Sequence, residues 1–530
     1  METQNIIVKF KNWINRFALP LILILAAFLR LYKIADYMTF LGDEGRDVLV
    51  AYNILHGHLT LLGPTSSVGG FFLGPIYYYF MAPFLLLFNY DPVGPAVMVA
   101  FFGIATVWLL YRFCKDFFNS KIGFIAAFLY AISPLVVSYS RSSWNPNPLP
   151  FFSLLTLWVL FKGIEQRKLK LIFISGILLG ICLQLHYLAL FLGAVIFFYI
   201  LLSEFSFGRI QILSTVVALV KKYLIFFAGF VIGWSPFLAF ELRHGFPDFK
   251  SIFDFVIHSG NTGASTNFFG TINDVFFRLF GRLVFSFPPP EQLFHYNSIA
   301  LLAWSILILT TAIISTLFLI VRLFKSFKEK SEDFRKYLII SIWFFVGILL
   351  FGFYKKAIYD YYFAFMFPLP FILTGLLIEF IYENKKLKIF GKSLAVILFL
   401  ILFALNIQGI PFRYPPNRQL NQMRTIADFV MTKTDAKPFN FALITGGNSD
   451  FAYRYFFTLW NHPPQTIEDF AHDPKRTTVT DQLFVVCESL PCQPLGNSLW
   501  EIAGFGRADI AGHWDVSVVE IYKLVHYKGK

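Results

Sequence analysis

Residues 298–321 read SIALLAWSILILTTAIISTLFLIV, a run of apolar and small polar residues that contains no charged side chain. As a helix this run would be about 36 Å long, and the hydrocarbon core of a bilayer is about 30 Å thick. The run therefore predicts a membrane-spanning helix. Similar runs recur along the chain at 18–33, 93–113, 122–140, 149–162, 171–185, 188–203, 223–240, 338–354, 362–380 and 389–409.

The composition of the whole chain agrees with this prediction. Of its 530 residues, 57% are hydrophobic and only 15% are charged, and the mean hydropathy is +0.62. A soluble protein of this length needs a more highly charged surface, so we expect a multi-span α-helical membrane protein. The net charge of +13 does not indicate nucleic acid as a partner, because Lys and Arg lie in short clusters between the apolar runs.

The basic clusters also predict the orientation of the chain in the cell membrane. Cytoplasmic loops are enriched in Lys and Arg, and alternation of about eleven spans from a cytoplasmic N-terminus puts the most basic loops inside. The C-terminus then lies outside, as do a first outer loop at 34–92 and a long outer loop at 241–297. The predicted inner loops are 112–121, 162–170, 209–222, 322–336 and 385–392.

One further apolar run, at 71–89, does not fit this alternation. Counting it as a span would invert every later loop and place the basic ones outside. Pro75 and Pro83 interrupt the run, and the tyrosines at 77–79 are typical of the headgroup region. We therefore expect a helix that lies in, or dips into, the outer interface.

The chain changes character near residue 411. A Pro-rich linker, PFRYPPNRQLNQ, is followed by a helical pattern and short strand-like runs. This predicts a small α/β or α+β soluble domain at 411–530, outside the membrane domain at 1–410. The soluble domain contains Cys487 and Cys492. An oxidising exterior favours a local disulfide between them, and a pair of free thiols is equally compatible with the sequence.

The most informative loop follows the first span. It contains Gly42-Asp43-Glu44-Gly45-Arg46-Asp47, so three carboxylates and one guanidinium lie next to the membrane surface. Charges near lipid are costly and often functional, but a solvated helix cap made by Asp43 explains them equally well. A carboxylate at this place could accept the proton of an acceptor hydroxyl that attacks a sugar carbon. Nearby arginines could stabilise a phosphate leaving group.

The other outer loops place further polar groups at the same level of the membrane. One aqueous cavity could collect these groups, although outer helix ends are polar in any membrane protein. The histidines have no spacing typical of a metal site, so we expect no metal. The candidate substrate-binding residues are Arg46, Arg141, Asn145, His186, Tyr187, Arg243, Lys355 and Tyr361.

Several of these features together resemble a known family. Asp43-Glu44-x-Arg46 follows the first span, a Gly-Pro-aromatic stretch begins at Gly74, and a later span ends in Ser133-Pro134-Leu135 and Tyr139-Ser140-Arg141. This order resembles the GT-C membrane glycosyltransferases, which include protein O-mannosyltransferases and lipid A aminoarabinose transferases. The chain is most similar to bacterial proteins of the dolichyl-phosphate-mannose-protein mannosyltransferase-like group.

The resemblance implies a polyprenyl-phosphate sugar donor, used on the outer face of the membrane, with Asp43 as the catalytic base. Glu44 would orient Asp43 or bind the sugar. The chain departs from the family where Leu73 and Gly74 replace an acidic residue and a lysine of the aminoarabinose transferases. Asn145 is the nearest match to a second acidic residue of the family. Both departures weaken the case for a metal and for lipid A as the acceptor.

The expected function is a metal-independent, inverting glycosyltransferase that needs no cofactor besides its lipid-linked sugar donor. Its expected partners are membrane lipid, the polyprenyl-phosphate sugar, and an acceptor that is a protein, a lipid or a polysaccharide. A transporter or flippase of lipid-linked sugars is an alternative, which the near absence of charged residues within the spans disfavours. A non-catalytic membrane scaffold is a further alternative, and it leaves the acidic first loop without a role.

Overall fold

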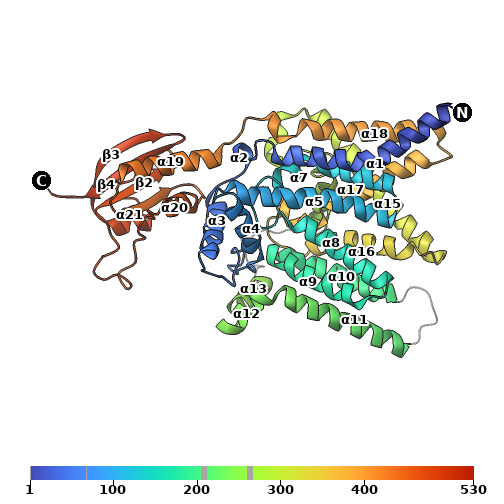
Figure 1. Ribbon diagram of the computed structural model, residues 1–530, viewed down its shortest axis with the longest axis horizontal. Coiled ribbons are helices and arrows are strands. Elements are labelled where there is room, and N and C mark those ends of the chain that lie inside the picture. Colours follow the sequence, from blue (N-terminus) through green and yellow to red (C-terminus); the bar gives the residue numbers. More distant parts are fainter. Residues whose placement is uncertain (1, 67, 205–211, 259–266, 530) are drawn as a thin grey trace.

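The computed structural model describes residues 2–66, 68–204, 212–258 and 267–529. Long helices run side by side in a bundle, and a smaller domain with a β-sheet lies beyond one end of it (Figure 1). The helices that correspond to the predicted apolar runs are α1 (Glu2–Leu31), α5 (Val93–Phe117), α6 (Ser120–Ile132), α8 (Leu149–Glu165), α9 (Leu169–Leu185), α10 (Leu190–Glu204), α11 (Ile212–Gly233), α15 (Ser298–Lys328), α16 (Phe334–Phe351), α17 (Pro368–Glu383) and α18 (Lys388–Gln408).

Every predicted apolar run falls on a helix, but the helices differ in length. Six helices of the described ranges are long and apolar enough to cross a membrane, and a bent pair, Asp360–Met366 with Pro368–Glu383, makes seven. Helices α6 and α9 have only 13 and 17 residues, whereas a straight span needs roughly 20. The multi-span helical architecture is confirmed, and the total of about eleven spans stays a prediction.

Prolines divide three of the predicted runs. Run 122–140 breaks between α6 and α7 (Pro134–Tyr139), and run 223–240 breaks between α11 and α12 (Ser235–His244). The third, 362–380, bends by 61° before α17, which begins at Pro368. Proline has no backbone N–H and is accommodated best in the first turn of a helix. Each break therefore starts a new helix, where hydropathy alone predicted a continuous one.

The segment between α1 and α5 covers one end of the bundle. It forms α2 (Ile34–Tyr37), α3 (Gly42–Leu55) and α4 (Ile76–Leu87). Helices α3 and α4 pack on each other and lie across the ends of the long helices, beside the smaller domain (Figure 1). Helix α4 has 12 residues and is therefore about 18 Å long, too short to cross the membrane. This agrees with the interfacial helix predicted for 71–89.

The segment predicted as a long outer loop, 241–297, is largely helical. It contains α13 (Pro247–His258), α14 (Phe268–Gly281) and η3 (Pro290–His295), and its residues 259–266 lie outside the described residues. Two arginines that end α14, Arg278 and Arg282, pair with Asp360 at 2.6 and 3.0 Å. These ion pairs tie α14 to η4 (Asp360–Met366), the element that contains Tyr361.

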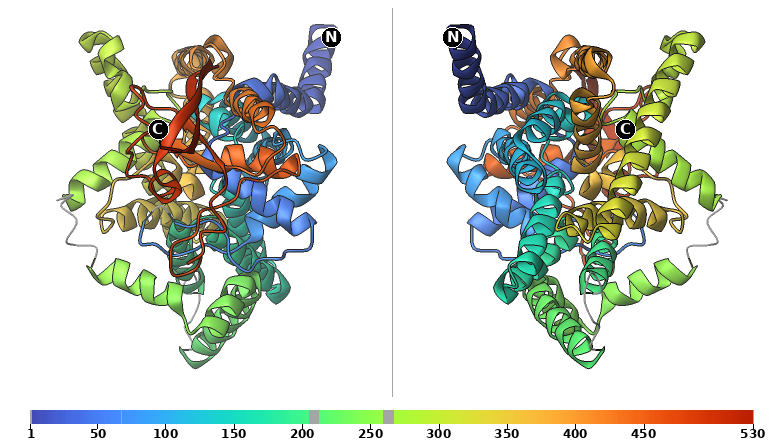
Figure 2. Two further views of the ribbon diagram at one scale, coloured as in Figure 1. Left: turned by 90° about the vertical axis from the view of Figure 1, so that its left-hand side faces the viewer. Right: turned by 90° about the vertical axis from the view of Figure 1, so that its right-hand side faces the viewer.

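The smaller domain has a four-stranded mixed sheet in the order β1-β2-β4-β3. Strands β1 and β2 are parallel, and β4 pairs antiparallel with both β2 and β3. A disulfide joins Cys487 and Cys492. Seen from its end, the domain lies over the end of the bundle (Figure 2, left). The elements are α19 (Gln419–Lys433), β1 (Asn440–Ile444), α20 (Phe451–Leu459), β2 (Gln482–Cys487), α21 (Trp500–Phe505), β3 (Ala508–Val516) and β4 (Val519–His526), after η5 (Pro411–Arg413).

Candidate active site

The first turn of α3 directs two neighbouring carboxylates to different places. Glu44 folds back, so that its Oε2 accepts a hydrogen bond from the backbone N–H of Leu41 at 3.0 Å, and the residue is only 7% exposed. Burial raises the pKa of Glu44 to about 7, although the Leu41 N–H opposes the shift. The side chain of Asp43, by contrast, is 62% exposed. Asp43 is therefore accessible to a substrate, whereas Glu44 closes the helix N-terminus.

Arg46 links Asp43 to a third carboxylate, which is fully buried. Its Nη1 lies 3.1 Å from Asp43 Oδ1, and its Nε and Nη2 donate to Asp47 Oδ1 at 3.0 and 2.8 Å. Tyr78 of α4 donates to the same Asp47 oxygen at 3.3 Å. Burial raises the pKa of Asp47 to about 6, and Arg46 opposes this rise. Charge-assisted contacts thus hold the guanidinium between two carboxylates.

Two glycines of the same turn allow the C-terminal domain to approach α3 closely. A Cβ atom on Gly45 would lie 2.3 Å from the backbone nitrogen of Ala452, and one on Gly42 would lie 2.0 Å from Ser449 Oγ. The backbone N–H of Gly42 donates to Asn448 Oδ1 at 2.8 Å. This turn is therefore part of the contact between the two domains.

A polar cavity of about 250 Å³ lies beside this turn. Six of the ten residues predicted for the site line it together. These are Asp43, Arg46, Asn145, His186, Tyr187 and Tyr361. They come from four segments that are distant in the sequence, so the structure brings together the polar groups that the sequence placed at one level of the membrane. The remaining lining residues are Thr65, Ser66, Leu73, Trp144 and Pro146.

Backbone contacts fix two of the side chains in the polar cavity. Asn145 Nδ2 donates to the carbonyl oxygen of Leu185 at 2.7 Å, and His186 Nδ1 accepts from the N–H of Leu188 at 3.2 Å. Burial lowers the pKa of His186 to about 3, so the imidazole is neutral at physiological pH and holds its proton on Nε2. His186 therefore offers a hydrogen-bond donor and no positive charge.

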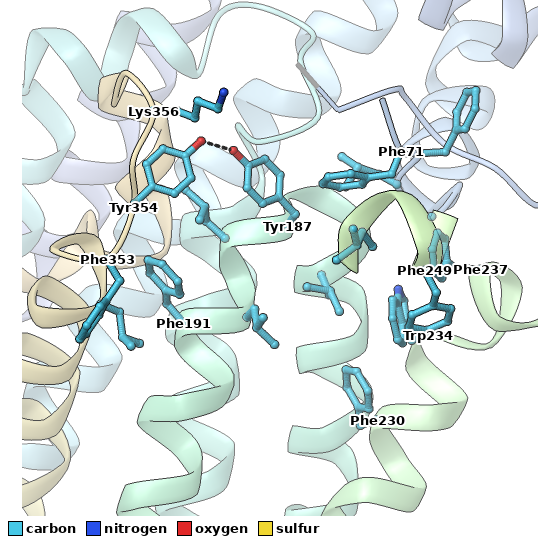
Figure 3. A pocket seen from close by; sticks show the side chains of 18 of the residues that line it. Phe71, Tyr187, Phe191, Phe230, Trp234, Phe237, Phe249, Phe353, Tyr354 and Lys356 are labelled. Atoms are coloured by element: carbon cyan, nitrogen blue, oxygen red, sulfur yellow. Dashed lines mark hydrogen bonds between the residues drawn. The ribbon is translucent and has the colours of Figure 1, made fainter. Parts of the chain in front are cut away.

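A larger apolar cavity of about 680 Å³ adjoins the polar cavity, and the two share Leu73 and Tyr187. Aromatic side chains from α10–α13 and from the segments that flank them surround it, among them Phe191, Phe230 and Trp234 (Figure 3). At its polar end the hydroxyls of Tyr187 and Tyr354 lie 2.7 Å apart. Two lysines also line the cavity, Lys355 and Lys356, and Figure 3 shows Lys356 above the tyrosine pair.

An interdomain cavity of about 610 Å³ lies on the other side of the polar cavity, and the two share Asp43 and Trp144. Its walls come from the α2–α3 segment, from residues 138–147 and from residues 447–449 of the C-terminal domain. Three cavities thus lie in series, from the apolar one through the polar one to the interdomain one. Asp43 stands where the second and the third cavity meet.

Four predicted site residues do not line the polar cavity. Lys355 lines the apolar cavity, Glu44 faces the interdomain cavity as part of the helix cap, and Arg243 is exposed at the end of α12. Arg141 is buried, and its guanidinium donates to the carbonyl oxygens of Leu29 and Tyr32 at 2.8 and 2.7 Å. In this geometry Arg141 anchors the end of α1. Its phosphate-binding role, like that of Arg243, stays a prediction.

Some residues of the site were not assigned from the sequence. Asp47 was part of the quoted motif, but nothing in its spacing indicates that it is buried and fixes Arg46. Trp144 lies directly before Asn145 in the sequence and lines two cavities. Tyr354 directly precedes Lys355. Trp144 and Tyr354 each stand directly before a predicted residue, and this proximity was the only available signal for them.

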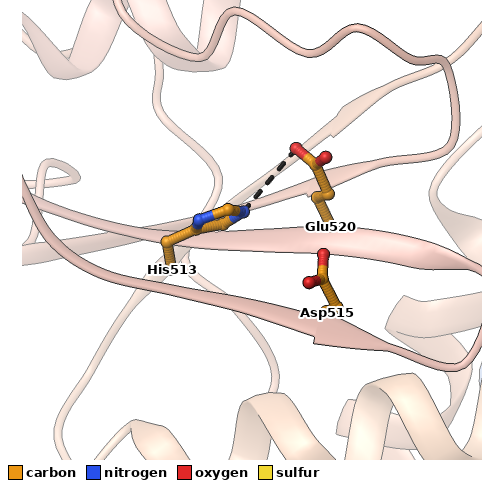
Figure 4. Close-up of side chains that lie close together, drawn as sticks. All are labelled: His513, Asp515 and Glu520. Carbon is orange, nitrogen blue, oxygen red and sulfur yellow. Dashed lines mark ion pairs between the residues drawn. The ribbon is translucent and has the colours of Figure 1, made fainter.

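A separate cluster of possible metal ligands lies on the β3–β4 hairpin of the C-terminal domain (Figure 4). It consists of His513, Asp515 and Glu520, whose ligand atoms all lie within 4.8 Å of one another. His513 Nε2 lies 3.7 Å from Glu520 Oε2. His513 and Asp515 are exposed, and the hairpin is not part of the three cavities, so we assign no cation to it. Within the described ranges, Asp43 belongs to no comparable cluster.

Comparison with known proteins finds a family model that matches part of the chain. Residues 73–234 match the model of the dolichyl-phosphate-mannose-protein mannosyltransferase family. Two proteins of Bacillus subtilis (strain 168), YycA and YkcB, are 26% identical over 163 residues and 28% identical over 147 residues. Both carry a mannosyltransferase name that is itself an inference. The matched regions cover 30% and 27% of this chain, but only 23% and 20% of those two proteins.

Similarity to solved structures extends over nearly the whole chain. ArnT from Cupriavidus metallidurans, bound to undecaprenyl phosphate, superposes with a TM-score of 0.57 at 12% identity and covers 95% of this chain and 97% of its own. The oligosaccharyltransferase AglB from Archaeoglobus fulgidus, bound to an inhibitory peptide and a dolichol-phosphate, gives a TM-score of 0.53 at 13% identity. That match covers 90% of this chain and 70% of AglB. The resemblance inferred from the sequence is therefore confirmed at the level of the fold, which this chain shares with ArnT and AglB.

Proposed function

We propose that this protein is a glycosyltransferase that moves a sugar from a polyprenyl-phosphate donor to a hydroxyl group of an acceptor. The observation that carries the proposal is the series of three cavities that meet at the Asp43 turn. Each has a chemistry suited to one part of such a reaction: an apolar cavity for a lipid chain, a polar cavity for a sugar phosphate, and an open interdomain cavity for an acceptor.

The apolar cavity suits the hydrocarbon part of the donor. Its volume of about 680 Å³ and its aromatic and aliphatic lining fit several isoprene units, because burial of apolar surface drives such binding. Lys355 and Lys356 line the same cavity, and Lys356 lies beside the pair of Tyr187 and Tyr354 (Figure 3), where the phosphate of the donor would sit. The undecaprenyl phosphate named for ArnT and the dolichol-phosphate named for AglB are ligands of this chemical class.

The proposed reaction is a single displacement in the polar cavity. The acceptor oxygen attacks the anomeric carbon of the sugar, and the bond between that carbon and the phosphate oxygen breaks. Asp43 accepts the proton of the acceptor hydroxyl. The phosphate leaves with its negative charge on the lipid, where Lys355 and Arg46 stabilise it. Attack from the side opposite the leaving group inverts the configuration at the anomeric carbon.

In this mechanism the other predicted residues bind and orient the sugar. His186 is neutral and donates from Nε2, while Asn145 and Tyr361 contribute further polar atoms to the cavity wall. Glu44 keeps the α3 turn in place through Leu41. The proposed mechanism assigns no step to a metal ion.

We place this site on the outer face of the membrane. Loop charges support this orientation, and so does the disulfide between Cys487 and Cys492, because disulfides persist in oxidising compartments. Reporter fusions at residues 330 and 480 test it. Residue 480 is expected to report outside and residue 330 inside, and the reverse result would place the site at the cytoplasmic face.

The experiment that tests the function uses the protein in liposomes with polyprenyl-phosphate hexoses and a panel of hydroxyl acceptors. We expect transfer by the parent and a loss of about 10²- to 10⁴-fold in kcat for Asp43→Asn. Asp36→Asn, a matched change in the same outer segment but outside the cavities, is expected to keep full activity. Absence of transfer with every donor would refute the function, and equal transfer by Asp43→Asn would remove Asp43 from the base role.

A further inference from the structure

The interdomain cavity has a lining that distinguishes between classes of acceptor. We propose that the acceptor is an uncharged saccharide, held in this cavity by Trp144 and by hydroxyl and amide groups from both domains. This inference rests on the proposed function and adds the chemical class of the acceptor, which neither the fold nor the similar proteins specify for this chain.

Neutral hydrogen-bonding side chains dominate the polar part of the cavity wall. Hydroxyls and primary amides both donate and accept hydrogen bonds, so they match the hydroxyl groups of a sugar in either direction. They come from three separate segments, so that they can surround a bound ring. The residues are Thr39, Ser138, Ser142, Asn147, Asn448 and Ser449.

Trp144 gives the cavity an aromatic face at the point where it meets the polar cavity. The indole is partly buried and packs against Tyr361, with ring centroids 4.3 Å apart. An aromatic ring is a rigid apolar surface, and the C–H face of a pyranose packs well on it. A sugar placed on Trp144 would lie beside Asp43, because the same two residues line both cavities.

The charges of the cavity disfavour anionic acceptors. None of the described residues that line it is Lys or Arg, and its acidic side chains include the carboxylates of Asp43 and Glu44. Arg46 pairs with Asp43 at 3.1 Å but lines the polar cavity, so a phosphate on the acceptor would find no cation on the wall of the interdomain cavity and would be disfavoured there. The cations of the site, Arg46 and Lys355, line the polar and the apolar cavity, where the donor phosphate needs them.

The cavity also lacks the usual means of binding an extended peptide. Peptides commonly add to an exposed sheet edge through backbone hydrogen bonds. The edge strands of the sheet are β1 and β3, and among the described residues neither strand contributes to the lining of the cavity. The C-terminal domain reaches the cavity only through the loop at 447–449, which presents side chains.

Hydrogen bonds of the Asn448 side chain hold the loop at 447–449 in place. Asn448 Oδ1 accepts from the N–H of Gly42 at 2.8 Å, and its Nδ2 donates to both Glu488 carboxylate oxygens at 3.1 Å. Tyr453 and Thr445 also donate to Glu488, at 2.8 and 2.9 Å. These contacts connect the loop that lines the interdomain cavity to the turn that contains Asp43. Because the loop is already held in place, little conformational entropy is lost when an acceptor binds.

The test compares uncharged saccharides with charged saccharides, and saccharides with peptides. The parent protein, with its lipid-linked donor, is given uncharged oligosaccharides, the same oligosaccharides bearing a phosphate, and peptides rich in Ser and Thr. We expect transfer to the uncharged saccharides to be about tenfold faster than to the phosphorylated ones, with no transfer to peptides. Equal or faster transfer to the phosphorylated saccharides or to the peptides would overturn the inference.

A charge variant makes the test specific to the cavity. Ser138 is exposed and lines the interdomain cavity, so Ser138→Lys is expected to fold and to reduce the preference for uncharged saccharides to less than about threefold. Ser498→Lys, at an exposed position of the C-terminal domain, is the matched control and should leave the preference unchanged. An unchanged preference in Ser138→Lys would mean that the acceptor does not lie in this cavity.

Binding without donor separates this inference from the proposed function. The Asp43→Asn protein is mixed with the same saccharides and peptides, and retention is measured directly. Binding of uncharged saccharides supports the inference. Failure to bind them, in a preparation that binds the polyprenyl-phosphate donor, would refute the acceptor class while leaving the donor site intact. If the protein neither binds nor consumes any donor, the proposed function fails, and the acceptor inference that rests on it fails too.

Discussion

The apolar cavity and the interdomain cavity have similar volumes, about 680 and 610 Å³, but opposite linings. Aromatic and aliphatic side chains with two lysines line the first, whereas hydroxyls, amides and two carboxylates line the second. Both border the polar cavity, one through Tyr187 and the other through Asp43. The difference indicates a division of work. The lysine-bearing cavity suits an anionic lipid, and the other suits a neutral polar molecule that must lose a proton.

The largest effect is expected from removal of the positive charge of Arg46, which lines the polar cavity between the apolar and the interdomain cavity. Arg46→Gln leaves the buried Asp47 without its cationic partner, and an unpaired buried charge costs about 3–5 kcal/mol. We expect a large loss of thermal stability, measured by unfolding in detergent, and loss of transfer to every acceptor. Arg167→Gln, at the exposed turn between α8 and α9, is the matched change. An equal loss in Arg167→Gln would show that the ion pair with Asp47 is not the cause.

The next largest effect separates acceptor binding in the interdomain cavity from donor binding in the apolar cavity. In Gly45→Ala the new methyl group would lie 2.3 Å from the Ala452 backbone, and such overpacking costs about 1–3 kcal/mol. We expect a higher KM for the acceptor, because α20 moves away from α3, with an unchanged Kd for the lipid-linked donor. Gly193→Ala is the control, since its Cβ would meet its nearest atom at an ordinary 3.5 Å. Weaker donor binding in Gly45→Ala would contradict the proposed division.

A smaller effect is expected on the donor side alone. Lys355→Ala removes one of two cations beside the apolar cavity, so the Kd for polyprenyl phosphate should rise about tenfold at low salt and less at high salt. The KM for the acceptor should stay the same. Lys386→Ala, at an exposed turn, controls for the change in net charge. A Kd that does not change would place the phosphate elsewhere.

The smallest effect concerns Glu44, which lines the interdomain cavity but to which we assign only the capping of α3. Its pKa is raised to about 7 in the folded protein from an ordinary value of 4.5, so the folded state retains the proton more strongly than the unfolded state. The buried negative charge therefore destabilises the protein increasingly as pH rises from about 4.5 to about 7. Glu44→Gln should unfold at a higher temperature than the parent at pH 8, with no gain at pH 4. A gain that is independent of pH would contradict this assignment.

The sequence predicted those parts of the structure that depend on hydropathy and on loop charge. Spans such as 298–321 became helices, and the residues placed at outer helix ends, including Asp43, Asn145 and His186, came together in one cavity. Hydropathy does not show where proline divides an apolar run, so the breaks at Pro134 and before α12 appeared only in the structure.

The roles of individual charged side chains were harder to predict, because they depend on backbone groups distant in the sequence. Arg141 resembles a phosphate ligand in the sequence, but its guanidinium is occupied by carbonyl groups at 29 and 32. Nothing in the sequence marks Gly42 and Gly45 as contact residues, but the C-terminal domain packs directly against both of them. Long-range packing of this kind leaves no periodic signal in a single sequence.

The central claim is that donor and acceptor meet at Asp43 from two different cavities. An experimental structure of the Asp43→Asn protein, with a polyprenyl-phosphate sugar and an uncharged oligosaccharide bound, tests it most directly. We predict density for the lipid chain in the apolar cavity, for the sugar in the polar cavity beside Tyr361, and for the oligosaccharide on Trp144, with one hydroxyl next to residue 43. Lipid density in the interdomain cavity, or saccharide density away from residue 43, would contradict the account.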